Sequence, residues 1–205
     1  MSNDHIDSEG FRANVGIILC NDDGELMLAG RVGSKGWQFP QGGMLEGESP
    51  EEAMFRELYE EVGLLEKDVL VLGTTDKWLR YRLPERYVRR DKKPLCVGQK
   101  QRWFMLKLVG DEEQVRFDQS GSPEFDRWRW VNFWHPVKEV IYFKRRVYAQ
   151  ALAELGPCIY PEGLPPEPRW WPNRWRVVFE KDRKRAERIK AGSQGLDHSE
   201  ANNSQ

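Results

Sequence analysis

Seven glutamates lie between residues 46 and 61, with a single cation, Arg56, among them. They are Glu46, Glu48, Glu51, Glu52, Glu57, Glu60 and Glu61. In a helix the last three occupy positions i, i+3 and i+4 and share one face, where like charges repel. A hard divalent cation relieves that repulsion, because Mg²⁺ prefers carboxylate and phosphate oxygens. The stretch therefore predicts either a cation site that clamps a polyphosphate and activates water, or a solvated acidic helix face.

The flanking residues predict a helix with defined ends. Ser49 is placed to cap it, Pro50 suits its first position, and Gly63 suits the residue that ends it. Glu51 and Glu52 suit the positive end of the helix dipole. The predicted buried stripe is Ala53, Met54, Leu58 and Val62. The acidic residues are thus expected on a helix that packs against a core.

Apolar patterning and turn residues predict the other elements. The expected strands are 11–20, 25–29, 37–39, 68–80, 95–109 and 126–131, with an Asp-Gly turn at 21–24 and a further helix over 143–154. We expect a flexible lead at 1–10, one domain at 11–157 and a partly disordered extension at 158–205. The extension is rich in Trp and Pro, and a short basic helix is expected in it to about residue 190.

The composition is typical of one globular domain: 205 residues, 39% hydrophobic, with a net charge of −1. This balance gives no chain-wide basic footprint for nucleic acid. No stretch approaches the roughly 18 apolar residues of a membrane span, and the N-terminus lacks a signal-peptide pattern. Cys20, Cys96 and Cys158 have neither disulfide nor zinc spacing. We therefore expect a cytoplasmic protein without a membrane partner, and a monomer.

The full pattern from Gly42 onward favours the cation site over the solvated face. Five residues separate Gly42 from Glu48, and seven more lead to Arg56-Glu57-Leu58-Tyr59-Glu60-Glu61-Val62-Gly63-Leu64. This resembles the Nudix box, G-x5-E-x7-R-E-U-x-E-E-x-G-U with U aliphatic, at every specified position. The resemblance implies an α/β fold, namely an α/β/α sandwich with a mixed sheet. It also implies cleavage of a nucleoside diphosphate linked to another group.

The Nudix resemblance also implies a role for each matching position. Glu57, Glu60 and Glu61 are expected to bind the cations, which would be Mg²⁺, with Mn²⁺ or another divalent ion as substitutes. Glu57 is the candidate general base within the box. Arg56 is expected to hold the glutamates by hydrogen bonds, and Gly42 to let the backbone approach the metal.

The resemblance extends beyond the box. The further matching segments are Trp37-Gln38-Phe39-Pro40-Gln41-Gly42-Gly43, Trp78-Leu79-Arg80-Tyr81, Lys93-Pro94-Leu95-Cys96-Val97-Gly98-Gln99-Lys100-Gln101, Pro123-Glu124-Phe125-Asp126, Trp128-Arg129-Trp130-Val131 and Phe143-Lys144-Arg145. Together they resemble the bacterial RNA pyrophosphohydrolases, once described as dinucleoside polyphosphate hydrolases. The resemblance runs from about Gly10 to about Tyr148 and implies RNA 5′ ends as substrate.

Two more positions match site residues of the family: Arg12 precedes the box and Glu124 follows it. Glu124 is expected near the metals, as a further ligand or an alternative base; the alternative is a cap on the turn after Pro123. Arg12 matches a family residue that contacts the 5′ phosphates.

Four more positions match the family's base-binding site. Arg31 and Phe143 are expected to sandwich an RNA base near the 5′ end, with Ile141 and Lys144 beside them. Stacking on aromatic rings is how proteins hold unpaired RNA bases. For Phe143 the alternative is a core residue at a helix start.

Residues 77–93 give separate support for an RNA partner. They hold eight Lys and Arg residues against Glu85 and Asp91, with Trp78, Tyr81 and Tyr87 interleaved. Positive charge with aromatic rings suits a phosphate backbone and unstacked bases. A charged strand edge exposed to solvent is the alternative.

Two other functions remain open on the sequence. A diadenosine polyphosphate or nucleotide-pool hydrolase would use the same chemistry but close around one base. A non-catalytic Nudix-fold RNA-binding module is disfavoured because all the box glutamates are present.

Overall fold

The computed structural model describes residues 6–173 and residue 175. The chain divides into two compact units, residues 1–165 and 166–205. Within the described residues, the first unit contains an eight-stranded sheet. Its strands are β1 (Phe11–Cys20), β2 (Leu26–Arg31), β3 (Trp37–Gln38), β4 (Gln41–Gly43), β5 (Val69–Thr74), β6 (Leu79–Arg82), β7 (Gly98–Leu108) and β8 (Phe125–Val131).

The sheet is mixed, as the Nudix resemblance predicts. β1 lies at its centre and runs parallel to β7 along its whole length, from Phe11 opposite Gly98 to Cys20 opposite Lys107. The remaining pairs are antiparallel: β2 and β4 with β1, β3 and β8 with β2, and β5 and β6 with β7. The short β4 therefore lies next to the central strand.

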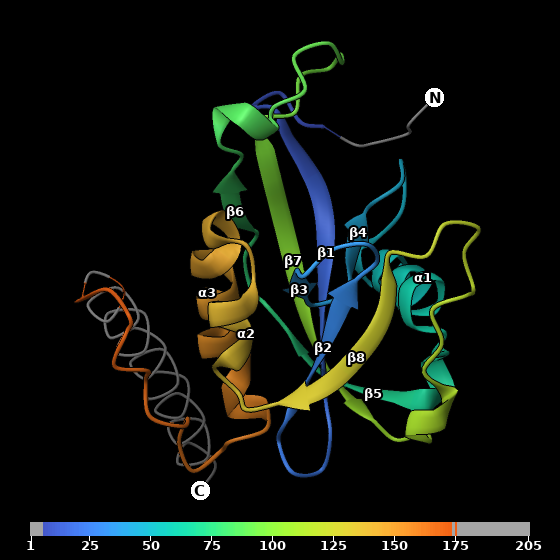
Figure 1. The fold of residues 1–205 in the computed structure, drawn as a ribbon, viewed down its shortest axis with the longest axis vertical. Coiled ribbons are helices and arrows are strands. Elements are labelled where there is room, and N and C mark those ends of the chain that lie inside the picture. Colours follow the sequence, from blue (N-terminus) through green and yellow to red (C-terminus); the bar gives the residue numbers. More distant parts are fainter. Residues whose placement is uncertain (1–5, 174, 176–205) are drawn as a thin grey trace, which may run out of the picture. The chain divides into compact units, whose positions relative to one another are not determined.

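Helices cover both faces of the sheet, which gives the expected α/β/α sandwich (Figure 1). The helices are α1 (Pro50–Val62), α2 (His135–Glu139) and α3 (Arg145–Leu155), with 3-10 turns η1 (Glu66–Asp68), η2 (Glu85–Tyr87), η3 (Glu112–Gln114), η4 (Tyr142–Lys144) and η5 (Gly156–Cys158). Helix α1 lies on one face, and α2 and α3 lie on the other.

Alternation along the strands supplies a core to each face. On the α1 face, alternate β1 residues such as Val15 and Ile17 pack in one buried cluster with Met54 and Leu58 of the helix. The α3 face is aromatic. There Phe39 stacks on Tyr148 at 5.0 Å between ring centroids, and Trp103 meets Tyr148 edge-on at 5.0 Å. Both faces of the sheet are therefore buried.

Helix α1 has the ends that the sequence predicts. The Ser49 side chain accepts from the Glu52 N–H at 3.2 Å, and the Glu52 carboxylate accepts from the Ser49 N–H at 2.8 Å. Gly63 ends the helix in the left-handed region, with φ 76°, and donates to the Tyr59 carbonyl at 2.9 Å. These capping bonds fix where the glutamate-bearing turns begin and end.

Several elements differ from expectation. The strand expected over 68–80 is two strands, β5 and β6, because the chain bends at Asp76 and Lys77 between them. The buried Thr75 hydroxyl accepts from the Trp103 N–H at 3.1 Å. The basic loop therefore starts after β6. β4 and α2 were not expected; both are too short to give a periodic pattern.

The chain ends also differ in part. Residues 6–10, expected within the flexible lead, form a turn in which Asp7 accepts from the Phe11 N–H and pairs with Lys100 at 2.9 Å. Residues 158–165, expected in the extension, belong to the first unit, and the Tyr160 hydroxyl donates to the Gly24 carbonyl at 2.9 Å. The basic helix expected to about residue 190 lies outside the described residues. No helix in the described ranges is long and apolar enough to cross a membrane.

Replacing Ser49 with alanine tests the cap of α1. We expect Ser49→Ala to lower the free energy of unfolding by about 1 kcal/mol, because the Glu52 N–H loses its acceptor. Urea denaturation followed by circular dichroism measures the change. Ser122→Ala, in the exposed loop before β8, is the control. Equal stability of the two variants would contradict the capping role.

Candidate active site

Arg56 is the centre of the hydrogen bonds that organise the acidic helix. Its Nε and Nη2 donate to the two oxygens of Glu48, at 2.7 and 2.9 Å. Its Nη1 donates to Glu57 Oε1 at 2.6 Å and to Glu60 Oε2 at 3.3 Å. Nη2 also donates to the Gly43 carbonyl at 2.8 Å. One guanidinium thus ties three carboxylates to each other and to β4, and these bonds raise its pKa.

Glu48 is a contact that the sequence analysis left without a role. It is the two-point partner of Arg56, and it also accepts from the Leu45 N–H at 2.8 Å. The Arg56 side chain holds the pKa of Glu48 below its usual value. In the sequence, the sign of this role is the fixed spacing of Glu48 and Arg56 in the box. The spacing indicates that Glu48 is paired, but it does not say with which residue.

The backbone of β4 lies directly against Glu57. A Cβ built on Gly42 would lie 1.7 Å from the Glu57 carboxyl carbon, so any side chain at position 42 would displace that carboxylate. Glu57 is buried, and burial raises its pKa, against the opposing effect of Arg56. The Glu57 carboxylate therefore occupies the space that a side chain at position 42 would fill.

Glu61 is a second buried carboxylate of the group. Its Oε2 accepts from the Gln41 N–H at 2.7 Å. Burial first, and then the charges of Glu124 and Glu57, raise its pKa well above the ordinary value. Glu60 and Glu124 likewise act to raise the pKa of Glu57. These acidic side chains thus repel one another across a small space.

The donor chemistry fits a hard divalent cation. The pKa values of Glu57 and Glu61 are raised in part by neighbouring carboxylates, and that penalty is lost when a cation joins them. The absence of a side chain at Gly42 lets the Glu57 carboxylate lie directly against the backbone of β4. Within the described residues, no three Asp, Glu, His or Cys side chains already stand in the geometry of a metal centre. Arg56 and the Gln41 N–H hold these carboxylates instead.

Glu124 joins the group from the loop before β8. Its Oε2 lies 3.9 Å from Arg31 Nη2, with both side chains half-exposed, and its carbonyl accepts from the Val32 N–H at 3.0 Å. Its charge also raises the pKa of Glu61. The structure therefore brings Glu124 and Arg31 to the acidic helix, although they are far from it in sequence.

Lys144 connects the acidic group to the predicted base site. Its side chain is buried at the start of α3. Burial, and then Arg31, lower its pKa to about 8, while Glu124 and Glu61 act in the opposite direction. A buried lysine held between acidic side chains and an arginine is an unusual arrangement, and such groups are typical of functional sites.

Phe143 is half-buried in a group of rings. Its ring centroid lies 5.7 Å from that of Tyr81, 5.1 Å from that of Tyr87 and 5.4 Å from that of Tyr142. Ile141, just before it, is exposed. Phe143 therefore fits the alternative of a core residue at a helix start only in part. Its ring packs against three other rings but is also partly exposed to solvent.

Arg12 lies beside β4. A Cβ on Gly43 would meet the Arg12 guanidinium at 2.1 Å, so the guanidinium crosses the backbone of Gly43. Gly43 is also the residue whose carbonyl accepts from Arg56. Arg12 is thus placed next to the residues that hold the glutamates.

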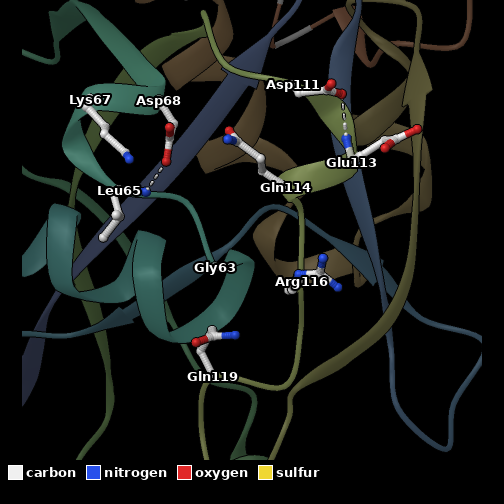
Figure 2. A pocket seen from close by; sticks show the side chains of 9 residues that line it. All are labelled: Gly63, Leu65, Lys67, Asp68, Asp111, Glu113, Gln114, Arg116 and Gln119. Carbon is white, nitrogen blue, oxygen red and sulfur yellow. Dashed lines mark hydrogen bonds between the residues drawn. The ribbon is translucent and has the colours of Figure 1, made fainter.

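A separate cavity of about 470 Å³ lies past the C-terminal end of α1 (Figure 2). It is lined by Gly63, Leu65, Lys67, Asp68, Asp111, Glu113, Gln114, Arg116 and Gln119. Asp68 accepts from the Leu65 N–H and Asp111 from the Glu113 N–H, each at 2.9 Å, as dashed in Figure 2. Both carboxylates therefore cap turns, and the cavity shares no residue with the acidic group.

Comparison with known proteins gives the family of the chain. Residues 10–155 match the family described as NUDIX domain. The chain is 62% identical to an RNA pyrophosphohydrolase of Alkalilimnicola ehrlichii over 163 residues, 80% of this chain and 90% of that protein. It is 60% identical to an RNA pyrophosphohydrolase of Ectopseudomonas mendocina over 152 residues, 74% of this chain and 96% of that protein.

Solved structures show the same fold at low identity. The E. coli dihydroneopterin triphosphate pyrophosphohydrolase has a TM-score of 0.55 at 18% identity, covering 68% of this chain and 94% of its own. A C. elegans Ap4A hydrolase binary complex has a TM-score of 0.51 at 17% identity, covering 69% and 94%. The fold and the site define a Nudix hydrolase. The chain belongs to the Nudix family, and its curated relatives at this identity are RNA pyrophosphohydrolases.

A methyl group at position 42 tests the contact between β4 and Glu57. We expect Gly42→Ala to lower kcat on the order of 100-fold, because misplacing a reacting group by about 1 Å costs that much. Steady-state phosphate-release kinetics measure the change. Gly121→Ala is the control, since nothing lies within 4 Å of its added Cβ. Wild-type kcat in Gly42→Ala would show that Glu57 need not occupy this position.

Proposed function

We propose that this protein is a divalent-cation-dependent RNA 5′-pyrophosphohydrolase that converts 5′-tri- or diphosphorylated RNA into 5′-monophosphorylated RNA. The observation that carries the proposal is the continuity of two groups of residues. Glu124 Oε2 lies 3.9 Å from Arg31 Nη2, and the buried Lys144, next to Phe143 in sequence, is near enough to Glu61, Glu124 and Arg31 for their charges to act on its pKa. The residues that would cleave the phosphates thus lie next to the residues that would hold a base. An RNA 5′ end needs both, because it carries its polyphosphate close to its first bases.

The acidic side chains would supply the cation site and the base. Glu57, Glu60, Glu61 and Glu124 would hold Mg²⁺, or Mn²⁺ in its place. When bound, such a cation neutralises the polyphosphate and lowers the pKa of the attacking water. Glu57 would take the proton from that water, with Glu124 as the alternative base. Pyrophosphate, or successive orthophosphates, would then leave.

The remaining residues position the reactants. Arg56 keeps Glu57 and Glu60 aligned through its hydrogen bonds. Arg12, beside β4, would meet the 5′ phosphates. The first bound base would lie between Arg31 and Phe143, with Ile141 and Lys144 at its edge.

The names of the relatives support RNA as substrate. Several curated proteins at 54–62% identity are called RNA pyrophosphohydrolases. In a bacterium, a 5′ monophosphate would expose the transcript to decay that depends on its 5′ end. The likeness to the Ap4A hydrolase reflects the fold alone at 17% identity, so dinucleoside polyphosphates stand as the second substrate to test.

Turnover of competing substrates tests the proposal. We expect kcat/KM for a short 5′-triphosphate RNA to exceed that for diadenosine polyphosphates in Mg²⁺, and chelator to abolish both activities. Glu57→Gln should lower kcat for the RNA on the order of 1,000-fold, as expected for the loss of a general base. Glu51→Gln is the matched control, since Glu51 is an exposed first-turn residue of α1.

The alternatives give different results. If the enzyme prefers diadenosine polyphosphates, we would conclude that dinucleotides and not RNA are its substrate. Binding of RNA without phosphate release, in wild type and in Glu57→Gln alike, would indicate a non-catalytic RNA-binding module.

A further inference from the structure

Two exposed tyrosines flank an arginine beside the proposed base site. Tyr87 of η2 and Tyr142 of η4 are 40% and 51% exposed. The Arg86 guanidinium carbon lies 5.0 Å from the centroid of the Tyr87 ring and 5.6 Å from that of the Tyr142 ring. Arg86 Nη2 also donates to the Tyr142 hydroxyl at 3.3 Å. We call Arg86, Tyr87 and Tyr142 the tyrosine ledge.

The tyrosine ledge is continuous with Phe143. The Phe143 ring touches both tyrosines, at 5.1 Å from Tyr87 and 5.4 Å from Tyr142 between centroids. Segments more than 50 residues apart in sequence therefore supply one surface, with η2 and η4 meeting through these rings. The ledge therefore lies next to Phe143, the ring assigned to the first bound base.

Neither tyrosine of the ledge is explained by the core. Buried aromatic rings such as Phe39 and Trp103 fill the α3 face, whereas Tyr87 and Tyr142 leave much of their surface to solvent. Exposed apolar surface gathered in one place is typical of a binding site. The guanidinium between them keeps its charge available to a phosphate, because Arg86 bonds a neutral hydroxyl.

The chemistry of the ledge fits an unpaired nucleotide. Aromatic faces stack on bases of any sequence, and an arginine beside them can stack or meet the phosphate that joins two nucleotides. The ledge also belongs to the basic stretch at 77–93, where eight Lys and Arg residues oppose two acids. A polyanion that carries flat rings is therefore a better match than a peptide.

We propose that the tyrosine ledge is a second stacking subsite, which takes a further base of the RNA beyond the one held at Phe143. The inference rests on the proposed function and extends it. With the base of the second nucleotide at Phe143, a two-nucleotide RNA has no base left for the ledge, so the proposal makes the enzyme sensitive to RNA length. A longer RNA gains the additional stacking contact.

Kinetics at two RNA lengths test the proposal. We compare kcat/KM for 5′-triphosphate RNAs of two and five nucleotides. In wild type, the five-nucleotide RNA should be preferred on the order of tenfold, the scale of one base–aromatic stack. Tyr142→Ala and Tyr87→Ala should each reduce that preference several-fold. Tyr142→Phe keeps the ring and should preserve it, and Arg86→Gln should reduce it and weaken its salt dependence.

Fluorescence gives a readout independent of turnover. A five-nucleotide 5′-monophosphate RNA, the reaction product, carries 2-aminopurine at its third position. Stacking on the ledge should quench its emission on binding to wild type, and Tyr142→Ala should remove the quenching. Lys67→Gln, which removes a positive charge in the turn after α1, is the matched control for Arg86→Gln and should behave as wild type.

The outcomes separate the two proposals. An equal length preference in wild type and Tyr142→Ala overturns the ledge subsite, while turnover of the two-nucleotide RNA leaves the proposed function intact. No length preference in wild type also overturns it and points to a different occupant, such as a peptide. If neither RNA is hydrolysed, the proposed function and the ledge subsite both fail.

Discussion

Repulsion among carboxylates on one helix is the constraint on which the rest of this structure depends. Glu57, Glu60 and Glu61 share a face of α1, and Glu124 adds a further negative charge from a distant loop. The Arg56 guanidinium offsets part of this repulsion through bonds to Glu57 and Glu60. Burial of Glu57 and Glu61 makes the remaining charge more costly. A divalent cation bound among these carboxylates would remove much of this repulsion and so stabilise the site.

The fold serves that group at three levels. The caps of α1 fix the register of its turns, and the buried stripe of Met54 and Leu58 fixes which face reaches solvent. Pairing of β4 with the central strand β1 holds the Gln41 N–H and the bare backbone of Gly42 against the carboxylates. The loop before β8 and the start of α3 then bring in residues of the base site. Chemistry and substrate binding are thus positioned by strands and helices that are far apart in sequence.

The sequence predicted what depends on local patterns. The caps and stripe of α1, the Asp-Gly hairpin and the mixed sheet implied by the Nudix resemblance are confirmed. Patterns could not supply what depends on tertiary contacts. β4 has three residues and is a strand only because β1 lies beside it. Likewise, nothing local shows that Tyr87 and Tyr142 share one arginine, or that Glu48 accepts two hydrogen bonds from Arg56.

Calorimetric titration of the protein with Mn²⁺, in wild type and in Glu61→Gln, tests the central claim most directly. Glu61 is the carboxylate whose burial and neighbours most disfavour its charge, so a cation should gain most by meeting it. The account predicts saturable binding to wild type and binding weakened by at least about tenfold in Glu61→Gln, the range seen when metal-site residues are lost. Equal binding by both proteins, or none by wild type, would contradict it.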